Sequence, residues 1–227
     1  MKFSLLKSIY IDKEYKRLYR NIFYEILKES PNSNYDETAM PSYTHKNNFI
    51  SWFFWKRIDA AFLLAGDIYG KTVLDFGCGG GVTFKYLNDC NCRVTGCDTN
   101  TYFLLKGICT KLALKAQLYK DLFAIKNQEF DIIFALDVLE HIENINLVIN
   151  KLLELSHDDT LLIVSGPTEN LFYKIGRLLA GFSGHYHLRT VFDIEEILKK
   201  RQLDNIISGS LYSPFPIFRI TSWRKSK

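Results

Sequence analysis

From Lys71 onward, short runs of β-favouring apolar residues alternate with longer segments whose apolar positions recur at helical spacing. This alternation is typical of a parallel sheet with helices on both faces. The expected strands are residues 72–76, 93–97, 116–120, 130–135, 160–165, 205–211 and 217–223, and the expected helices are 81–88, 101–113, 145–156, 169–180 and 193–201. Pro214 and Pro216 suggest a hairpin-like connection before the last strand. The pattern predicts a doubly wound α/β sheet of seven strands, mostly parallel, with the last strand antiparallel.

Two helical segments precede this region. Residues 2–29 place apolar side chains on one face and Lys and Arg on the other, and Pro31 ends the helix. A loop at 31–43 leads to a second helix at 47–65, which Gly66 or Gly70 ends. The predicted division is a helical extension or lid at 1–66 and a sheet domain at 67–227.

The first helix is expected to pack its apolar stripe on the core. A substrate lid and a membrane-surface helix are the alternatives, because its other face is basic. The stripe consists of Ile11, Tyr15, Leu18, Tyr19, Ile22, Phe23 and Ile26. The second helix offers for burial Trp52, Phe53, Trp55, Ile58, Phe62 and Leu63.

A glycine-rich turn follows the first expected strand, in the segment Val-Leu-Asp-Phe-Gly-Cys-Gly-Gly-Gly that ends at Gly81. Glycines at a strand end allow positive φ and let a ligand approach the backbone closely. The helix that follows should point free N–H groups at the ligand. About 20 residues later the second strand ends in Asp98, where a carboxylate can accept hydrogen bonds from ribose hydroxyls. These features predict a nucleoside-binding βαβ unit.

Dinucleotide-binding proteins use a similar turn, and three details separate the two interpretations. The glycines are spaced G-x-G-G-G and not G-x-G-x-x-G. Asp75 stands two residues before the first glycine, where it would repel a pyrophosphate. The fourth strand runs into Asp137, Glu140 and His141, an acidic-histidine cluster at a strand end.

Together, the glycine turn, Asp98 and the segment 130–142 resemble three motifs of the class I S-adenosylmethionine (SAM) methyltransferases, in their order. The resemblance covers the chain from about Lys71 to its end and implies a Rossmann-like fold with SAM as the cofactor. It places the methionine part of SAM at Asp75, Gly77, Cys78 and Gly79, the ribose at Asp98 and Thr99, the adenine at Asp121 and Leu122, and Leu136 beside the cofactor. Arg57 on the preceding helix is either a partner of the methionine carboxylate or a surface charge.

His141 is the expected general base, because an imidazole can accept a hydroxyl proton near neutral pH. Glu140 is expected beside it, and His185, in a glycine-flanked loop with His187, is expected to assist. The D-x-x-E-H pattern also resembles the E-x-x-E-H metal cluster of ubiquinone-pathway O-methyltransferases and small-RNA ribose methyltransferases. Asp137 replaces the first Glu of that cluster, so the expected site contains no metal. A site for Mg²⁺ or Mn²⁺ at Asp137, Glu140 and His141 stays open as the alternative, because two carboxylates and an imidazole suit these ions.

Composition and charge change this picture little. The chain has 227 residues, is 47% hydrophobic and carries a formal net charge of +4, which is ordinary for one globular chain. Five cysteines are expected as small buried side chains of a reducing compartment. Charges interrupt each apolar window, so we expect neither a signal peptide nor a transmembrane span, and a cytoplasmic location.

The expected function is methyl transfer to a small molecule, at oxygen, with saccharide, lipid-linked and quinone-like acceptors all open. Peripheral membrane contact stays open as well. Nucleic acid is a less favoured partner, because no N/D-P-P-Y/F motif follows the fourth strand and only the first helix is strongly basic. Two further functions remain as rivals, a non-catalytic SAM-binding scaffold and a nucleotide-dependent oxidoreductase.

Overall fold

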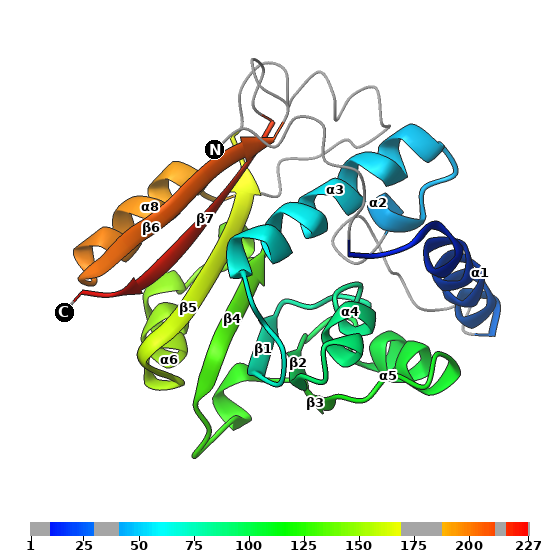
Figure 1. The fold of residues 1–227 in the computed structure, drawn as a ribbon, viewed down its shortest axis with the longest axis horizontal. Coiled ribbons are helices and arrows are strands. Elements are labelled where there is room, and N and C mark those ends of the chain that lie inside the picture. Colours follow the sequence, from blue (N-terminus) through cyan, green and yellow to red (C-terminus); the bar gives the residue numbers. More distant parts are fainter. Residues whose placement is uncertain (1–9, 30–40, 169–187, 212–216, 227) are drawn as a thin grey trace.

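The alternation of strands and helices forms one sheet in the computed structural model, which describes residues 10–29, 41–168, 188–211 and 217–226 (Figure 1). Within these residues seven strands lie in the order β3-β2-β1-β4-β5-β7-β6. β7 is antiparallel to both of its neighbours, and the pairs among β1 to β5 are parallel. The strands are β1 (Thr72–Phe76), β2 (Arg93–Cys97), β3 (Gln117–Tyr119), β4 (Phe130–Leu136), β5 (Ser156–Pro167), β6 (Leu203–Leu211) and β7 (Phe218–Lys225). The predicted fold is confirmed.

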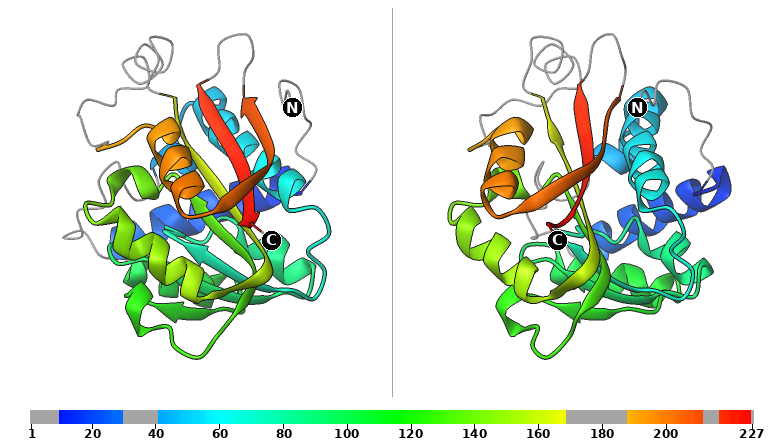
Figure 2. Two further views of the ribbon diagram at one scale, coloured as in Figure 1. Left: turned by 90° about the vertical axis from the view of Figure 1, so that its left-hand side faces the viewer. Right: turned by 60° about the vertical axis from the view of Figure 1, so that its left-hand side comes forward.

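Helices cover both faces of the sheet and form two apolar cores (Figure 2). The helices α3 (Asn48–Ala65), α4 (Phe84–Asp89) and α5 (Tyr102–Lys111) pack on one face, and α6 (Ile145–Glu154) and α8 (Val191–Lys200) on the other. The central strand β4 is buried along nearly its whole length, which explains its apolar run from Ile132 to Leu136. Cys78, Cys97 and Cys109 are buried, as expected, and none of the five cysteines forms a disulfide.

The helix α1 (Lys13–Glu29) packs its stripe against this core, together with the short α2 (Pro41–Thr44). α1 starts at Lys13 because Asp12 accepts a hydrogen bond from the Tyr15 amide at 2.7 Å, so the predicted start at residue 2 is wrong for the described residues 10–12. Leu18, an expected member of the stripe, is 49% exposed, and Trp52 of α3 is 40% exposed. The other stripe residues are buried.

Most other boundaries differ from the predictions by one or two residues, and those of α4, β3 and β5 differ for visible reasons. α4 begins at Phe84, because the turn of glycines 79–81 occupies the positions before it. β3 has three residues, two fewer than expected. β5 starts at Ser156, four residues early, because residues 156–159 continue the strand after α6 ends at Glu154. The predicted helix 169–180 and the prolines at 214 and 216 lie outside the described residues.

Gly77 and Gly70 make a matched test of backbone strain, because each has φ +70°. A Cβ on Gly70 would meet nothing within 4 Å, whereas a Cβ on Gly77 would lie 2.4 Å from Cγ2 of Val138. We expect Gly70→Ala to lower the free energy of unfolding by about 1–2 kcal/mol, the cost of a left-handed alanine. Gly77→Ala should cost clearly more, since Val138 must also move. Urea unfolding of both variants measures the difference, and equal losses would contradict the contact with Val138.

Candidate functional site

The glycine turn between β1 and α4 is a left-handed segment of backbone. Gly77, Gly79 and Gly81 have φ values of 70°, 53° and 68°. The amides of Gly77 and Cys78 donate to the carbonyl of Cys97 at the end of β2, at 2.8 and 3.4 Å, and the Gly81 amide donates to the Cys78 carbonyl at 2.8 Å. These amides are therefore used inside the protein and are not directed at a phosphate.

Asp98 ties this turn to the turn after β2. Its Oδ2 accepts a hydrogen bond from the Gly79 amide at 2.9 Å, and its Oδ1 accepts from the amides of Asn100 and Thr101 at 3.0 and 2.8 Å. The Thr101 hydroxyl returns a bond to the Gly79 carbonyl at 2.8 Å. Thr99 is exposed and donates its hydroxyl to the Lys120 carbonyl at 3.0 Å. A carboxylate has about four acceptor positions, and these three amides leave one free on Oδ2, which can accept a ribose hydroxyl.

Asp75 lies beneath the same turn and is 3% exposed. The Thr83 hydroxyl donates to its Oδ2 at 2.5 Å. Burial, opposed by the Thr83 hydrogen bond and assisted by the nearby charge of Asp98, raises the pKa of Asp75 to about 7. A carboxylate that loses solvation in this way would be stabilised by a cationic ligand, such as one that carries a sulfonium or ammonium group.

Asp121 and Leu122 follow β3, beside the end of β2. Asp121 is exposed, and its side chain accepts a bond from the Phe123 amide at 3.0 Å, which starts the short helix η1 (Leu122–Ala124). Leu122 is buried against the sheet. The Asp98 amide donates to the carbonyl of Tyr119 at 3.1 Å, so the ends of β2 and β3 are joined.

At the end of β4, Asp137 forms an ion pair with Arg57 of α3. Asp137 has φ 52°, and its Oδ1 accepts a hydrogen bond from the Ser165 hydroxyl at 2.6 Å. Arg57 is buried, donates to the Tyr43 hydroxyl at 2.5 Å, and is surrounded by the rings of Tyr43, Phe54 and Phe218. Arg57 is therefore neither a surface charge nor directed at the methionine site here.

The oxygens of Asp137 are thus engaged by Arg57 and Ser165. Among the described residues no group of three His, Cys, Asp or Glu side chains is arranged to hold a metal ion. Sequence reasoning singles out Arg57 and Asp137 separately and misses their pairing. The signal available in the sequence is only their opposite charge.

Glu140 and His141 form the short helix η2 (Leu139–His141) directly after β4. Glu140 is 1% exposed and His141 is half-buried. Leu136, the last residue of β4, is buried, and Val138 packs against Gly77. The segment of residues 136–143, called the β4 tip below, therefore meets the glycine turn. His185 and His187 lie outside the described residues.

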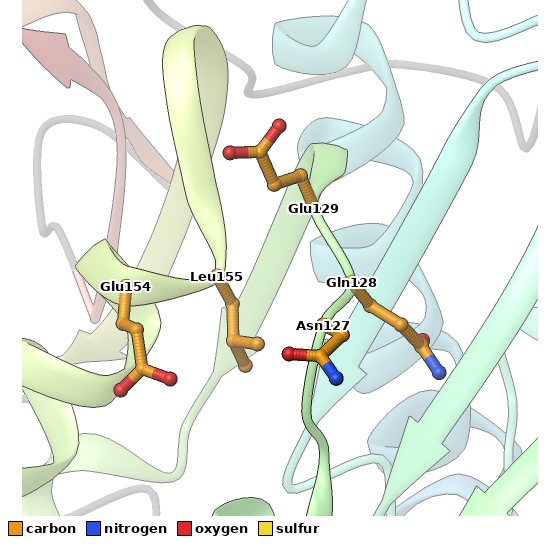
Figure 3. A pocket seen from close by; sticks show the side chains of 5 residues that line it. All are labelled: Asn127, Gln128, Glu129, Glu154 and Leu155. Atoms are coloured by element: carbon orange, nitrogen blue, oxygen red, sulfur yellow. The ribbon is translucent and has the colours of Figure 1, made fainter.

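The structure therefore brings Asp75, Asp98, the glycine turn and the β4 tip together at the carboxyl ends of β1, β2 and β4. A separate pocket lies at the amino ends of β4 and β5, lined by Asn127, Gln128, Glu129, Glu154 and Leu155 (Figure 3). It lies at the amino ends of the strands, opposite the carboxyl ends where the glycine turn lies. None of the predicted site residues that the structure describes lines it. No helix among the described residues is long and apolar enough to cross a membrane.

Comparisons with known proteins agree with this geometry. A family model described as a methyltransferase domain matches residues 52–207. The chain is 28% identical over 170 residues to the ubiquinone biosynthesis O-methyltransferase of Bartonella quintana (strain Toulouse), covering 68% of each protein. It is 32% identical over 108 residues to the enzyme of that name from Glaesserella parasuis serovar 5 (strain SH0165), covering 43% of this chain and 46% of that one. The chain thus spans less than half the length of the second relative.

Solved structures show the same fold. The magnesium protoporphyrin IX methyltransferase from Synechocystis PCC 6803 with bound SAM matches with a TM-score of 0.59 and 20% identity, over 98% of this chain and 99% of that one. Since the family model covers more than half of the chain, the resemblance drawn from the three motifs is confirmed. The chain therefore belongs to the methyltransferase domain family and is a SAM-dependent methyltransferase of class I.

Proposed function

We propose that the chain transfers a methyl group from SAM to a hydroxyl oxygen of a small molecule, with His141 as general base. The observation that carries the proposal is the glycine turn held by Asp98 and contacted by Val138, three residues before the half-buried His141. The O-methyltransferase relatives support an oxygen acceptor. The sulfonium of SAM supplies the driving force, so the protein has only to align the reactants and to accept a proton.

The residues fit this cofactor in two ways. The turn amides already donate to protein oxygens, which disfavours a pyrophosphate. Asp75 and Asp98 give the site negative charge, which suits a cation. We propose that Asp75, Gly77, Cys78 and Gly79 bind the methionine part, Asp98 and Thr99 the ribose, and Asp121 and Leu122 the adenine, with Leu136 beside the methyl group.

We also propose that residues 1–66 act as a cover for the cofactor. The Tyr19 hydroxyl of α1 donates to the Gly80 carbonyl at 3.0 Å, and the Tyr19 and Trp55 rings meet edge to face at 5.9 Å. The extension therefore touches the glycine turn directly. Glu140 and His185 are proposed to assist His141.

Titration calorimetry with S-adenosylhomocysteine tests cofactor binding, and incubation of the protein with SAM and cell-extract metabolites tests transfer. Mass spectrometry should find a metabolite heavier by one methyl group. Absence of binding would exclude the cofactor site. Methylation of RNA instead of a small molecule would contradict the proposed acceptor.

Asp98→Ala should weaken S-adenosylhomocysteine binding by about 10- to 100-fold, because hydrogen bonds to a charged group contribute about 1.5–3 kcal/mol. Asp131→Ala is the matched control. Asp131 also joins two strands through hydrogen bonds, to the Thr72 amide and hydroxyl at 2.7 and 2.6 Å, but at the opposite edge of the sheet. Its variant should bind normally in calorimetry, and equal losses in both variants would show a general structural effect.

Asp75→Asn should stabilise the ligand-free protein at pH 8 while weakening cofactor binding. Because burial raises the folded-state pKa of Asp75 to about 7, the folded protein holds this proton more tightly than the unfolded chain does. The protonated Asp75 therefore makes its full contribution to the free energy of unfolding below about pH 4. This contribution is lost as the pH rises to about 7, which lowers the free energy of unfolding by up to about 4 kcal/mol. Urea unfolding across this range should show a flatter pH dependence in the variant. If the free energy of unfolding had the same pH dependence in the variant and the wild type, the ionisation of Asp75 would carry no cost in stability.

His141→Gln should lower kcat by about 10²- to 10⁴-fold, the usual contribution of a general base, and leave cofactor affinity unchanged. His157→Gln is the control, since His157 lies near Asp131 at the other edge of the sheet. Steady-state kinetics with the acceptor found in the screen measures both. A His141→Gln enzyme with normal kcat would favour a purely positional mechanism or a scaffold.

A further inference from the structure

Hydrogen bonds join the β4 tip to the segment just before α8. The Leu188 amide donates to the Glu140 carbonyl at 2.9 Å. The Arg189 guanidinium donates from Nη1 to the Ile142 carbonyl at 2.5 Å and from Nη2 to the Glu143 carbonyl at 3.0 Å. Two consecutive residues thus bind the backbone on both sides of His141.

The turn η2 in the β4 tip is held by few backbone hydrogen bonds of its own. η2 is a single short turn, closed by bonds from the His141 amide to the Val138 carbonyl at 3.1 Å and from the Ile142 amide to the Leu139 carbonyl at 3.3 Å. Such turns have poorer hydrogen-bond geometry than an α-helix. The residue that enters this tip from β4, Asp137, is in the left-handed region with φ 52°. Bonds from outside the turn therefore add to the few backbone bonds that hold the segment carrying His141.

The backbone next to Arg189 is held in place by the start of α8. The next residue, Thr190, caps α8 in a reciprocal pair with Asp193, with its hydroxyl and amide each 2.8 Å from the Asp193 carboxylate. Ile194 and Leu198 bury α8 in the core on that face of the sheet. The planar, forked guanidinium directs two N–H donors in fixed geometry at the two adjacent carbonyls, whereas an ammonium group on its flexible stem has no such fork.

We propose that Arg189 is a positioning residue that orients His141 for proton removal from the acceptor. This rests on the proposed function of His141. Arg189 acts by holding the Ile142 and Glu143 carbonyls, and so the turn that carries the imidazole, and not by contact with the reacting atoms. Nothing in the spacing of the motifs points to it, because it is 48 residues from His141 in the sequence.

The test compares Arg189→Gln and Arg189→Lys with Arg201→Gln. Arg201, just after α8, is the matched control, because its guanidinium also binds two oxygen acceptors, the side chains of Asn146 and Asn150 of α6. The two arginines make similar contacts at opposite ends of the same helix. They differ in what they hold, since Arg189 binds the β4 tip and Arg201 binds α6.

Two readouts separate positioning from stability. Imidazole ¹H–¹⁵N spectra of ¹⁵N-histidine protein, with and without S-adenosylhomocysteine, report on His141, whose signals are assigned by their loss in His141→Gln. Arg189→Gln should displace the His141 signals and leave those of His157 in place, and should lower kcat by about 10- to 100-fold at unchanged cofactor affinity. Arg189→Lys should fall between it and the wild type. Arg201→Gln should change unfolding stability only.

Unchanged His141 signals and unchanged kcat in Arg189→Gln would overturn the inference, even if that variant unfolds more easily. An equal displacement in Arg201→Gln would also overturn it, since α8 as a whole would then be responsible. Should the wild type bind no S-adenosylhomocysteine or methylate nothing, the proposed function fails. The spectra recorded without ligand would still decide whether Arg189 holds His141.

Discussion

The hydrogen bonds of Asp98 hold the glycine turn, and the rest of the site depends on that constraint. One carboxylate accepts amides from Gly79 on one side and from Asn100 and Thr101 on the other. The ends of β1 and β2 are thereby fixed relative to each other. α1 adds Tyr19 above the turn and the β4 tip adds Val138 beside it. Left-handed glycines make this close approach feasible, since a side chain at Gly77 would occupy the space of Val138.

The charges at this edge of the sheet are arranged in two different ways. Asp75 is buried with the Thr83 hydroxyl as its partner, so its ionisation is costly and its pKa rises to about 7. Asp137, by contrast, is paired with the buried Arg57. A cationic ligand relieves the first arrangement and gains little from the second. The electrostatics therefore favour a sulfonium near the glycine turn.

Local sequence determines some parts of the structure, and these are the parts that it predicts well. The strands at 72–76 and 93–97 have the predicted bounds, because a short apolar run between turn residues fixes both ends. Glycine spacing and the acid after the second strand locate the turn for the same reason. The predictions that fail depend on the rest of the molecule. Leu18 has the right spacing for the stripe of α1, yet it lies at the margin of that face and is exposed. Whether Arg57 meets Asp137 depends on how α3 crosses the sheet, which no local pattern encodes.

The two halves of the site are thus built by different means. The glycine turn is held by hydrogen bonds between neighbouring strand ends, from backbone amides to carbonyls and to the Asp98 side chain, which any sequence with the right glycines and acids can form. The β4 tip is held by side chains from distant segments, Arg57 on one face of the sheet and Arg189 on the other. The geometry of the β4 tip can therefore change through a single long side chain without disturbing the glycine turn. This explains in physical terms why the motifs identify the cofactor so readily and the acceptor so poorly.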